Sequence, residues 1–299
     1  MRVFVTGAAG FIGRAVVQEL LSHGHTVLAL ARNEATADAV RKAGAEPHPG
    51  DLEDPESLTR GAQAADGVIH LAFIHEFTDF ARPTVVDRAA IEAMGKALAG
   101  TSKPLVIATG TLSLPKSVLA TEHSPLDTEG PYALRAQSPK LLHALSKSEG
   151  FRGIEVRLSP TVHDKGDWGF VPILMRAAQK NGFVGYVGEG ETVWPAVHRL
   201  DSAVLFRLAL EKGLDGASYH AVAEQGIASK DIMAAIGRKL GLPVKSLSLE
   251  EATEALGSFF LANGVATDNP TSSEWTRSQL GWHLTQVGLL EDIEKNYAT

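Results

Sequence analysis

The chain has 299 residues, of which 44% are hydrophobic and 21% are charged, as is usual for a globular protein. Its 28 Lys and Arg and 35 Asp and Glu give a net charge of −7, which argues against nucleic-acid binding, because that requires a basic face. The absence of cysteine excludes disulfides, thiolate nucleophiles and zinc–thiolate sites. At about 150 residues per domain, the length predicts two domains or one large α/β unit.

No targeting segment or membrane span is predicted. An apolar run follows Met1-Arg2, but Gly7, Arg14 and Glu19 interrupt it within the length of a signal peptide. No stretch approaches the roughly 18 uncharged apolar residues of a membrane-spanning helix. We therefore expect a cytoplasmic protein with no membrane partner.

Strands and helices alternate over the first 160 residues. Strands are predicted at 3–5, 26–31, 67–71, 105–108 and 154–158, and helices at 11–23, 34–42, 81–99 and 139–149. This alternation predicts an α/β fold with a Rossmann-type doubly wound parallel sheet.

The pattern changes after residue 160, where glycine and aromatic residues dominate positions 163–195. A helix at 201–211, a strand at 218–222 and further helices from Ser229 follow. We therefore expect a nucleotide-binding domain and a smaller C-terminal substrate-binding lobe. The domain comprises residues 1–160 and 197–222, and the lobe comprises residues 161–196 and 223–299.

A glycine-rich segment, Thr6-Gly7-Ala8-Ala9-Gly10-Phe11-Ile12-Gly13, joins the first predicted strand to the first helix. Glycines in this position allow a tight turn, a close approach of the backbone to a pyrophosphate and close packing of helix on strand. The free N–H groups at the helix start would then hold the phosphates. The segment predicts a dinucleotide site.

The same segment resembles the Thr-Gly-x-x-Gly-Phe-Ile-Gly motif of the short-chain dehydrogenase/reductase superfamily, in its extended and atypical branches. The segments Gly50-Asp51-Leu52, His70-Leu71-Ala72 and Val197-His198-Arg199-Leu200-Asp201 are also similar to family motifs. An atypical subgroup of this superfamily is described as NAD(P)-dependent epimerase/dehydratase-like. With the glycine loop, the resemblance implies a cofactor site formed by Gly7, Ala9, Gly10, Phe11, Ile12, Gly13, Arg32, Asp51, Leu52, Leu71, Ala72, Thr109, Pro160, Thr161 and Val162.

The end of the second predicted strand indicates NADP(H). NAD enzymes place Asp or Glu there for the ribose 2′-hydroxyl, whereas this chain has Ala31-Arg32-Asn33. A guanidinium at Arg32 suits a 2′-phosphate. A solvated surface role for Arg32 stays open, and Glu34 keeps NAD possible.

The resemblance implies catalysis by a hydroxyl, a Tyr and a Lys four residues beyond it. Thr111 and Tyr132 match the first two positions, but Ala136 stands where the Lys is expected. A free phenol has a pKa of about 10, which the missing ammonium would have lowered. Tyr132 is therefore either the proton donor or a loop aromatic that lines a pocket.

Asp87 falls where extended family members carry an Asn. Two readings of this residue stay open. It either retains a water molecule near the active site or lies on the helix surface, paired with Arg88 or another base. Asp87 completes the candidate catalytic set with Thr111 and Tyr132.

Aromatic residues gather in two segments, after the fourth predicted strand and across residues 168–194. Ligands in open α/β sheets bind beyond the carboxyl ends of the strands, so we expect both segments to face a substrate there, although some of the aromatics would form the lobe's own core. The candidate substrate residues are Phe73, His75, His163, Trp168, Phe170, Trp194 and His198.

These features predict an NADP(H)-dependent oxidoreductase that transfers hydride between nicotinamide and a small apolar or aromatic carbonyl, imine or enone. The alternatives are an NAD(P)-dependent epimerase or dehydratase with recycled cofactor, and a non-catalytic dinucleotide sensor. No metal motif or hydrolase elbow is present in the sequence. We expect a monomer or homodimer whose partner is a small-molecule substrate.

Overall fold

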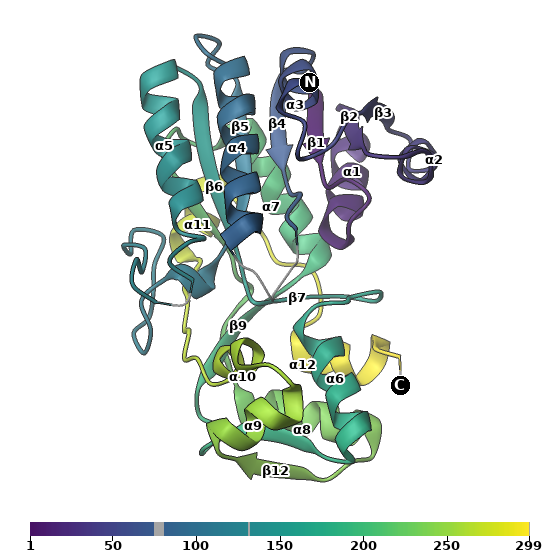
Figure 1. The fold of residues 1–299 in the computed structure, drawn as a ribbon, viewed down its shortest axis with the longest axis vertical. Helices are drawn as coiled ribbons and strands as arrows, with labels where there is room; N and C mark the ends of the chain where they lie inside the picture. The colour runs from purple at the N-terminus through teal and green to yellow at the C-terminus, as the bar shows by residue number, and fades with distance from the viewer. Residues whose placement is uncertain (75–80, 131, 299) are drawn as a thin grey trace.

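A computed structural model describes residues 1–74, 81–130 and 132–298 of the chain (Figure 1). Its central element is a parallel seven-stranded sheet with the strand order β10-β6-β5-β4-β1-β2-β3. This is the Rossmann order with one added edge strand, and it confirms the predicted fold class. The strands are β1 (Arg2–Thr6), β2 (Thr26–Ala31), β3 (Glu46–Pro49), β4 (Gly67–His70), β5 (Pro104–Gly110), β6 (Arg152–Leu158) and β10 (Ser218–Ala221).

Helices cover both faces of this sheet (Figure 1). Strand β1 shows why, because Val3 and Val5 point into one hydrophobic cluster and Phe4 points into the other. The first face carries α1 (Phe11–Ser22), α2 (Glu34–Lys42) and α7 (Arg199–Lys212). The second face carries α3 (Pro55–Gln63), α4 (Ala81–Ala97) and α5 (Gln137–Glu149).

The sequence pattern missed two elements of this sheet domain, β3 and α3. Strand β3 reads Glu-Pro-His-Pro, which has no apolar alternation, and it is tolerated because it lies at the sheet edge. Helix α3 begins with Asp54 as its N-cap and Pro55 in its first turn, a start signal that predicts a helix.

A second lobe forms from the chain after β6 and holds its own hydrophobic cluster. It contains a three-stranded sheet of order β11-β9-β7 and a parallel pair, β12 with β8. The strands are β7 (Thr161–His163), β8 (Val184–Val187), β9 (Val193–His198), β11 (Glu224–Ala228) and β12 (Val244–Leu247). The helices are α6 (Phe170–Asn181), α8 (Ser229–Leu240), α9 (Leu249–Leu256), α10 (Phe259–Val265) and α12 (Leu289–Asn296).

One segment of the last part of the chain packs on the large sheet instead. Helix α11 (Glu274–Leu280) and Trp282 follow α10 in sequence, yet Leu280 and Trp282 lie in the cluster that contains β1 and α1. The indole of Trp282 donates a hydrogen bond to the carbonyl of Asp201 at 2.9 Å. The domain division predicted from the sequence assigns all of residues 223–299 to the second lobe and so does not include this contact.

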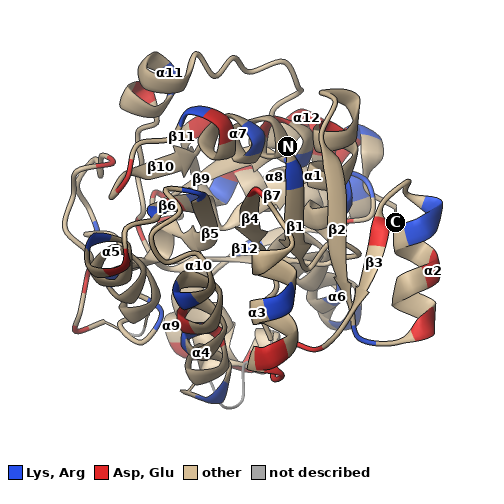
Figure 2. Ribbon diagram, turned by 90° about the horizontal axis from the view of Figure 1, so that it is seen from above, with Lys and Arg blue, Asp and Glu red and all other residues tan. Residues whose placement is uncertain are grey.

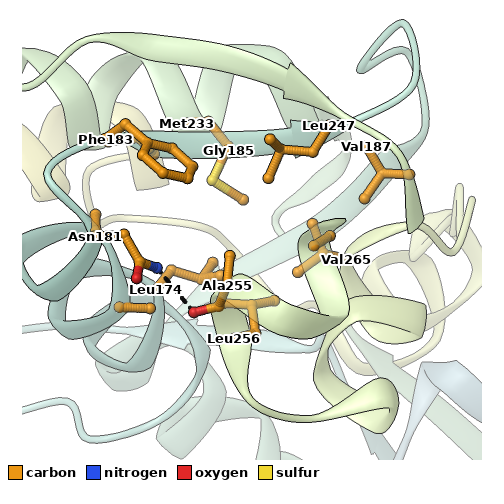
Figure 3. A pocket seen from close by; sticks show the side chains of 14 residues that line it. Leu174, Asn181, Phe183, Gly185, Val187, Met233, Leu247, Ala255, Leu256 and Val265 are labelled. Carbon is orange, nitrogen blue, oxygen red and sulfur yellow. Dashed lines mark hydrogen bonds between the residues drawn. The ribbon is translucent and has the colours of Figure 1, made fainter. Parts of the chain in front are cut away.

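The second lobe contains a small apolar cavity between α6, α9 and the β8–β12 pair (Figure 3). Leu174, Phe183 and Leu256 are among its lining residues, and Asn181 donates to the carbonyl of Ala255 at 2.8 Å beside it. Its volume of about 20 Å³ holds about one water molecule. This cavity is too small for a substrate and a cofactor.

Charged residues of both signs are interspersed on the outer helices, whereas most of the sheet is uncharged (Figure 2). Helix α2 illustrates this, since Arg41 lies within hydrogen-bond distance of both Glu34 and Asp38. In the described part of the chain, no helix has both the length and the apolar character needed to cross a membrane.

Replacing Trp282 by Ala is expected to lower the free energy of unfolding by about 3–5 kcal/mol, because the indole is only 1% exposed and its removal leaves a cavity. Phe259, which is 62% exposed, provides the control, and Phe259→Ala should change stability by less than about 0.5 kcal/mol. Urea denaturation measures both values. Equal small effects would show that the segment around Trp282 does not stabilise the sheet domain.

Candidate active site

A cleft of about 830 Å³ opens at the carboxyl ends of the parallel strands, where the strand order reverses between β1 and β4. This is where ligands bind in open α/β sheets, and the volume is typical of ligand pockets. The lining residues predicted from the sequence are Gly7, Ala9, Gly10, Phe11, Ile12, Gly13, Arg32, Asp51, Leu52, Leu71, Ala72, Phe73, Pro160, Thr161, Val162, Trp168 and Phe170. The lining residues missed are Ala8, Leu30, Thr36, Glu53, Ile74, Ala108, Leu158, Asp167, Gly169, Ile173 and Leu261.

The glycine loop forms the floor of the cleft because two of its positions have no room for a side chain. A Cβ on Gly13 would lie 2.0 Å from the carbonyl oxygen of Gly7. A Cβ on Gly7, whose φ is +72°, would lie 2.8 Å from the backbone nitrogen of Ala72. The start of α1 therefore packs directly against the ends of β1 and β4.

The N-terminus of α1 lies open to the cleft. Gly10 is its N-cap and provides no side-chain hydrogen bond, and no acidic residue stands in the first turn. Phe11, Ile12 and Gly13 of that turn line the cleft. Backbone N–H groups at such a helix end attract anions, so the residues fit the pyrophosphate of a dinucleotide.

Arg32 and Thr36 line the far end of the cleft, beyond β2. Arg32 is exposed, and the neighbouring Asn33 caps α2 by accepting hydrogen bonds from Thr36. The carboxylate of Glu34 is 2.6 Å from Arg41 and is not part of the cleft lining. Arg32 and Thr36, and not Glu34, therefore provide polar side chains at this end of the cleft.

Thr109 is the one predicted cofactor residue that does not line the cleft. Its buried hydroxyl donates to the carboxylate of Glu155 at 2.6 Å, and Glu155 also pairs with Arg157 at 2.8 Å. The wall of the cleft at this strand is Ala108 instead. Side chains alternate along a strand, so Thr109 points away from the face that Ala108 presents.

Thr111 is buried in the short 3₁₀ turn η1 (Thr111–Ser113) and does not line the cleft. Its hydroxyl donates to the side chain of Asn269 at 2.8 Å, and Asn269 donates back to the carbonyl of Thr111 at 3.1 Å. In this arrangement its hydroxyl is bonded to the segment between α10 and α11, outside the lining of the cleft.

Tyr132 lies in a turn before α5 and is 6% exposed. Its ring packs edge-on against Phe260 at 5.3 Å, and its hydroxyl has no hydrogen-bond partner among the described residues. Burial raises the pKa of Tyr132 to about 12. Lys116 lies near its ring, with Nζ 5.9 Å from the centroid, but donates to the carbonyls of Leu112 and Leu114. Tyr132 does not line the cleft.

Asp87 on α4 is buried, which contradicts its interpretation as a surface residue paired with Arg88. Its carboxylate is bonded by the guanidinium of Arg135, by the hydroxyl of Ser138 at 2.5 Å and by His70 at 3.3 Å. Burial alone would raise the pKa of Asp87, but Arg135, His70 and Ser138 together hold that pKa at about 2. Asp87 is therefore a buried anion at neutral pH.

The hydrogen-bond network around Asp87 extends to residues that line the cleft. The other ring nitrogen of His70 lies 2.7 Å from the hydroxyl of Thr6, which accepts a bond from the Ala72 N–H at 3.2 Å. Arg135 donates to the carbonyl of Ala108 at 2.6 Å, and its guanidinium lies over the ring of Phe73, 4.2 Å from the centroid. The network therefore links β1, β4 and β5 with α4 and α5.

The sequence does not predict the role of Arg135, because the direction of its side chain depends on the turn that precedes α5. Residues 132–136 form a turn, and α5 begins at Gln137. Helix α5 therefore begins two residues before the predicted start at residue 139, and the hydroxyl of Ser138 in its first turn bonds Asp87. Two sequence features could have indicated this ion pair. Arg135 stands next to Ala136, where the Lys is expected, and Asp87 replaces the expected Asn.

The candidate substrate residues separate into two groups. Phe73, Trp168 and Phe170 line the cleft, and His75 lies outside the described residues. The remaining residues, His163, Trp194 and His198, are buried behind it. His163 is 2.7 Å from Asp292, the indole of Trp194 donates to Gly264, and His198 accepts from the Leu200 N–H.

Asp167 is a lining residue that was missed from the sequence, although it directly precedes Trp168. One carboxylate oxygen accepts from the Gly169 N–H at 2.7 Å and the other from the Tyr297 hydroxyl at 2.6 Å. Burial raises the pKa of Asp167, although the bonds from Tyr297 and Gly169 oppose the shift. In the described residues, no group of three or more His, Asp or Glu is placed to hold a metal ion.

Comparison with known proteins gives a family for most of the chain. Residues 3–222 match the model of the NAD dependent epimerase/dehydratase family. The protein called "Uncharacterized protein YLL056C" of Saccharomyces cerevisiae is 48% identical over 301 residues, covering 100% of this chain and 99% of that protein. The 4-hydroxy-2-methyl-3-oxo-4-farnesyl-3,4-dihydroquinoline-1-oxide ketoreductase of Stigmatella aurantiaca is 28% identical, covering 73% of this chain and 67% of that protein.

Solved structures share the fold over nearly the whole chain. The dTDP-glucose 4,6-dehydratase DesIV of Streptomyces venezuelae, with NAD and TYD bound, has a TM-score of 0.77 and 20% identity over 99% of this chain and 95% of that one. The UDP-glucose 4-epimerase of Thermus thermophilus, in complex with NAD, has a TM-score of 0.74 and 24% identity over 99% and 97%. At these identities the likeness shows the fold alone.

Replacing Gly13 by Ala is expected to weaken NADPH and NADH binding roughly 5- to 150-fold, because the new Cβ would displace the loop from the end of α1. Fluorescence titration of each nucleotide measures the change. Gly110→Ala is the matched control, since its Cβ would have 3.8 Å to the Leu158 carbonyl oxygen. Folded Gly13→Ala protein with wild-type affinity would contradict the proposed role of the loop.

Replacing Asp87 by Asn is expected to lower the free energy of unfolding at neutral pH by about 3–5 kcal/mol, because Arg135 loses its counter-charge while largely buried. The folded-state pKa of about 2 lies below the unfolded value of about 3.9, so wild type has this stabilisation above about pH 4. The stability difference from the variant should therefore shrink as the pH falls toward about 2.

Urea denaturation of both proteins between about pH 7 and pH 2.5 measures this difference. Asp38→Asn is the control, because Asp38 and Arg41 form an exposed pair, and it should change stability by less than about 0.5 kcal/mol. A difference for Asp87→Asn that does not vary with pH would contradict the assignment.

Proposed function

The chain belongs to the NAD dependent epimerase/dehydratase family, and from this premise we propose that it is an NADP(H)-dependent oxidoreductase. Its reaction transfers hydride between nicotinamide and a small apolar or aromatic carbonyl, imine or enone. The observation that carries the proposal is a single cleft with a glycine loop, a basic end at Arg32 and an apolar, aromatic end around Phe73 and Phe170.

The basic end supports NADP(H) over NAD(H). Arg32 and Thr36 provide a guanidinium and a hydroxyl at the edge of the cleft, where the 2′ position of the adenosine ribose would lie. The guanidinium forms charge-assisted hydrogen bonds with a phosphate. Glu34, the carboxylate that leaves NAD as an alternative, pairs with Arg41 and does not line the cleft, which also supports NADP(H).

The protein's contribution to the reaction is to hold and orient the cofactor. The first turn of α1 would bind the pyrophosphate, and Pro160, Thr161 and Val162 would border the nicotinamide ring. When bound, the reduced nicotinamide supplies a hydride. The apolar wall around the ring excludes water, which protects this chemistry from side reactions.

The composition of the cleft also supports an apolar substrate over a nucleotide sugar. Arg32 is the sole basic side chain among the described residues that line it. A second diphosphate would need its own cations, and none of the described lining residues supplies one at the aromatic end. The Stigmatella relative, whose name gives a ring-bearing oxo compound and a farnesyl chain, is consistent with this substrate class.

The cofactor preference is tested by NADPH and NADH oxidation with a panel of aryl ketones, imines and enones. Wild type is expected to prefer NADPH, and Arg32→Ala to lower kcat/KM for NADPH roughly 10- to 150-fold with little effect on NADH, because a phosphate contact of about 1.5–3 kcal/mol is lost. Arg60→Ala, which removes an exposed guanidinium near Glu56 on α3, is the control and should leave both values unchanged.

Three results would contradict the proposal. A clear preference for NADH that Arg32→Ala does not alter would reject NADP(H). Product formation without stoichiometric NADPH loss would indicate an epimerase or dehydratase with recycled cofactor, whereas tight binding without turnover would indicate a dinucleotide sensor.

A further inference from the structure

We propose that Asp167 is the general acid of this reaction and protonates the substrate heteroatom as hydride arrives. This inference rests on the function proposed above. It addresses a gap in the site, since the Tyr132 hydroxyl and the Thr111 hydroxyl both lie outside the cleft lining.

Asp167 is the titratable side chain that the described residues place at the aromatic end of the cleft. The other charged lining residues, Arg32, Asp51 and Glu53, follow β2 and β3 at the adenosine end. Asp167 instead lies between β7 and α6, next to Trp168 and the Gly169–Phe170 helix start.

Two hydrogen bonds fix the carboxyl group of Asp167. The Gly169 N–H donates to Oδ1 at 2.7 Å, and the Tyr297 hydroxyl donates to Oδ2 at 2.6 Å. Each carboxyl oxygen can accept more than one hydrogen bond, so both retain capacity for a further partner, and the residue lines the cleft. Tyr297 follows α12 and acts through its hydrogen bond to Asp167, so it is a positioning residue.

The surroundings of Asp167 favour the protonated form more than water does. Burial raises the pKa of its carboxyl group, whereas the hydrogen bonds from Tyr297 and the Gly169 N–H and the Coulombic interaction with His163 oppose this shift. His163 on β7 is itself bonded to Asp292 on α12. A carboxylic acid whose pKa moves toward the working pH is a more effective proton donor.

The step balances without a further reactant. The substrate carbon gains a hydride from the reduced nicotinamide, and a new C–H bond forms while the C=O π pair moves onto oxygen. That oxygen takes the Asp167 proton and becomes a hydroxyl. The carboxylate that remains keeps the bonds from Tyr297 and Gly169, and a proton from the solvent restores the acid, so each reduction consumes one solvent proton. In the reverse direction the carboxylate accepts the alcohol proton.

The test uses full-length protein with NADPH and 1-phenyl-1,2-propanedione, within the same panel of carbonyl compounds. Asp167→Asn is expected to lower kcat/KM roughly 100- to 1,000-fold, since general acid catalysis contributes on this scale. Asp167→Glu should keep part of the rate. In wild type, kcat/KM should fall as the pH rises through the pKa of Asp167, and this limb should be missing in Asp167→Asn.

Tyr297→Phe separates a chemical role from a structural one. Losing the donor to the carboxylate should raise the pKa of Asp167 and shift the falling limb to higher pH, with the low-pH rate retained. A ¹³C NMR titration of the Asp carboxyl groups without cofactor gives the same pKa independently of turnover. Asp127→Asn is the matched control, because Asp127 also accepts a glycine N–H, from Gly130 at 3.1 Å, and should leave the rate unchanged.

The outcomes distinguish this inference from the function on which it rests. Wild-type protein that binds NADPH but reduces no member of the panel would reject the proposed function and this inference with it. Asp167→Asn with the wild-type rate, with folding verified by circular dichroism, would overturn the inference alone. Loss of activity in His75→Ala with an unchanged Asp167→Asn would also overturn it.

Discussion

The buried charge of Asp87 is the constraint that organises the site. A carboxylate that is 1% exposed keeps its charge only if partners replace the water it has lost. Those partners are Arg135 in the turn before α5, Ser138 in α5 and His70 in β4. The same network holds the ends of β1 and β5 through the Thr6 hydroxyl and the Ala108 carbonyl. The walls of the cleft therefore depend on the charge of Asp87, which is not itself a lining residue.

The ion pair of Asp87 and Arg135 also explains how the site departs from the family pattern. Where the resemblance expects an Asn and a Lys, the chain has Asp87 and an Arg one residue before Ala136, so the charges compensate each other inside the protein. The ammonium that would lower the pKa of a catalytic phenol is absent, and burial raises the pKa of Tyr132 to about 12. In the proposed mechanism, the proton donor is Asp167, which lines the cleft, and not Tyr132, which does not.

The sequence predicted what local backbone geometry determines. The glycine loop, Arg32 and the alternation of strands and helices are read from neighbouring residues, and the fold class is confirmed. Contacts between distant residues could not be predicted this way: Thr111 bonds Asn269, 158 positions away, and Asp167 bonds Tyr297, 130 positions away. The contact of Arg135 with Asp87 could not be predicted for a different reason, because the direction of the Arg135 side chain depends on where α5 begins. His163 and His198 were predicted to face a substrate, but both are buried, where β7 and β9 pack against α12.

A crystal structure of the protein with NADP⁺ and a substrate ketone bound tests the central claim most directly. The account predicts that the 2′-phosphate contacts Arg32 and Thr36, and that the ketone oxygen lies within hydrogen-bond distance of the Asp167 carboxyl group. It also predicts that Tyr132 still packs against Phe260 with its hydroxyl outside the cleft. A structure in which the Tyr132 hydroxyl turns to the ketone, with Asp167 remote from it, would contradict the account.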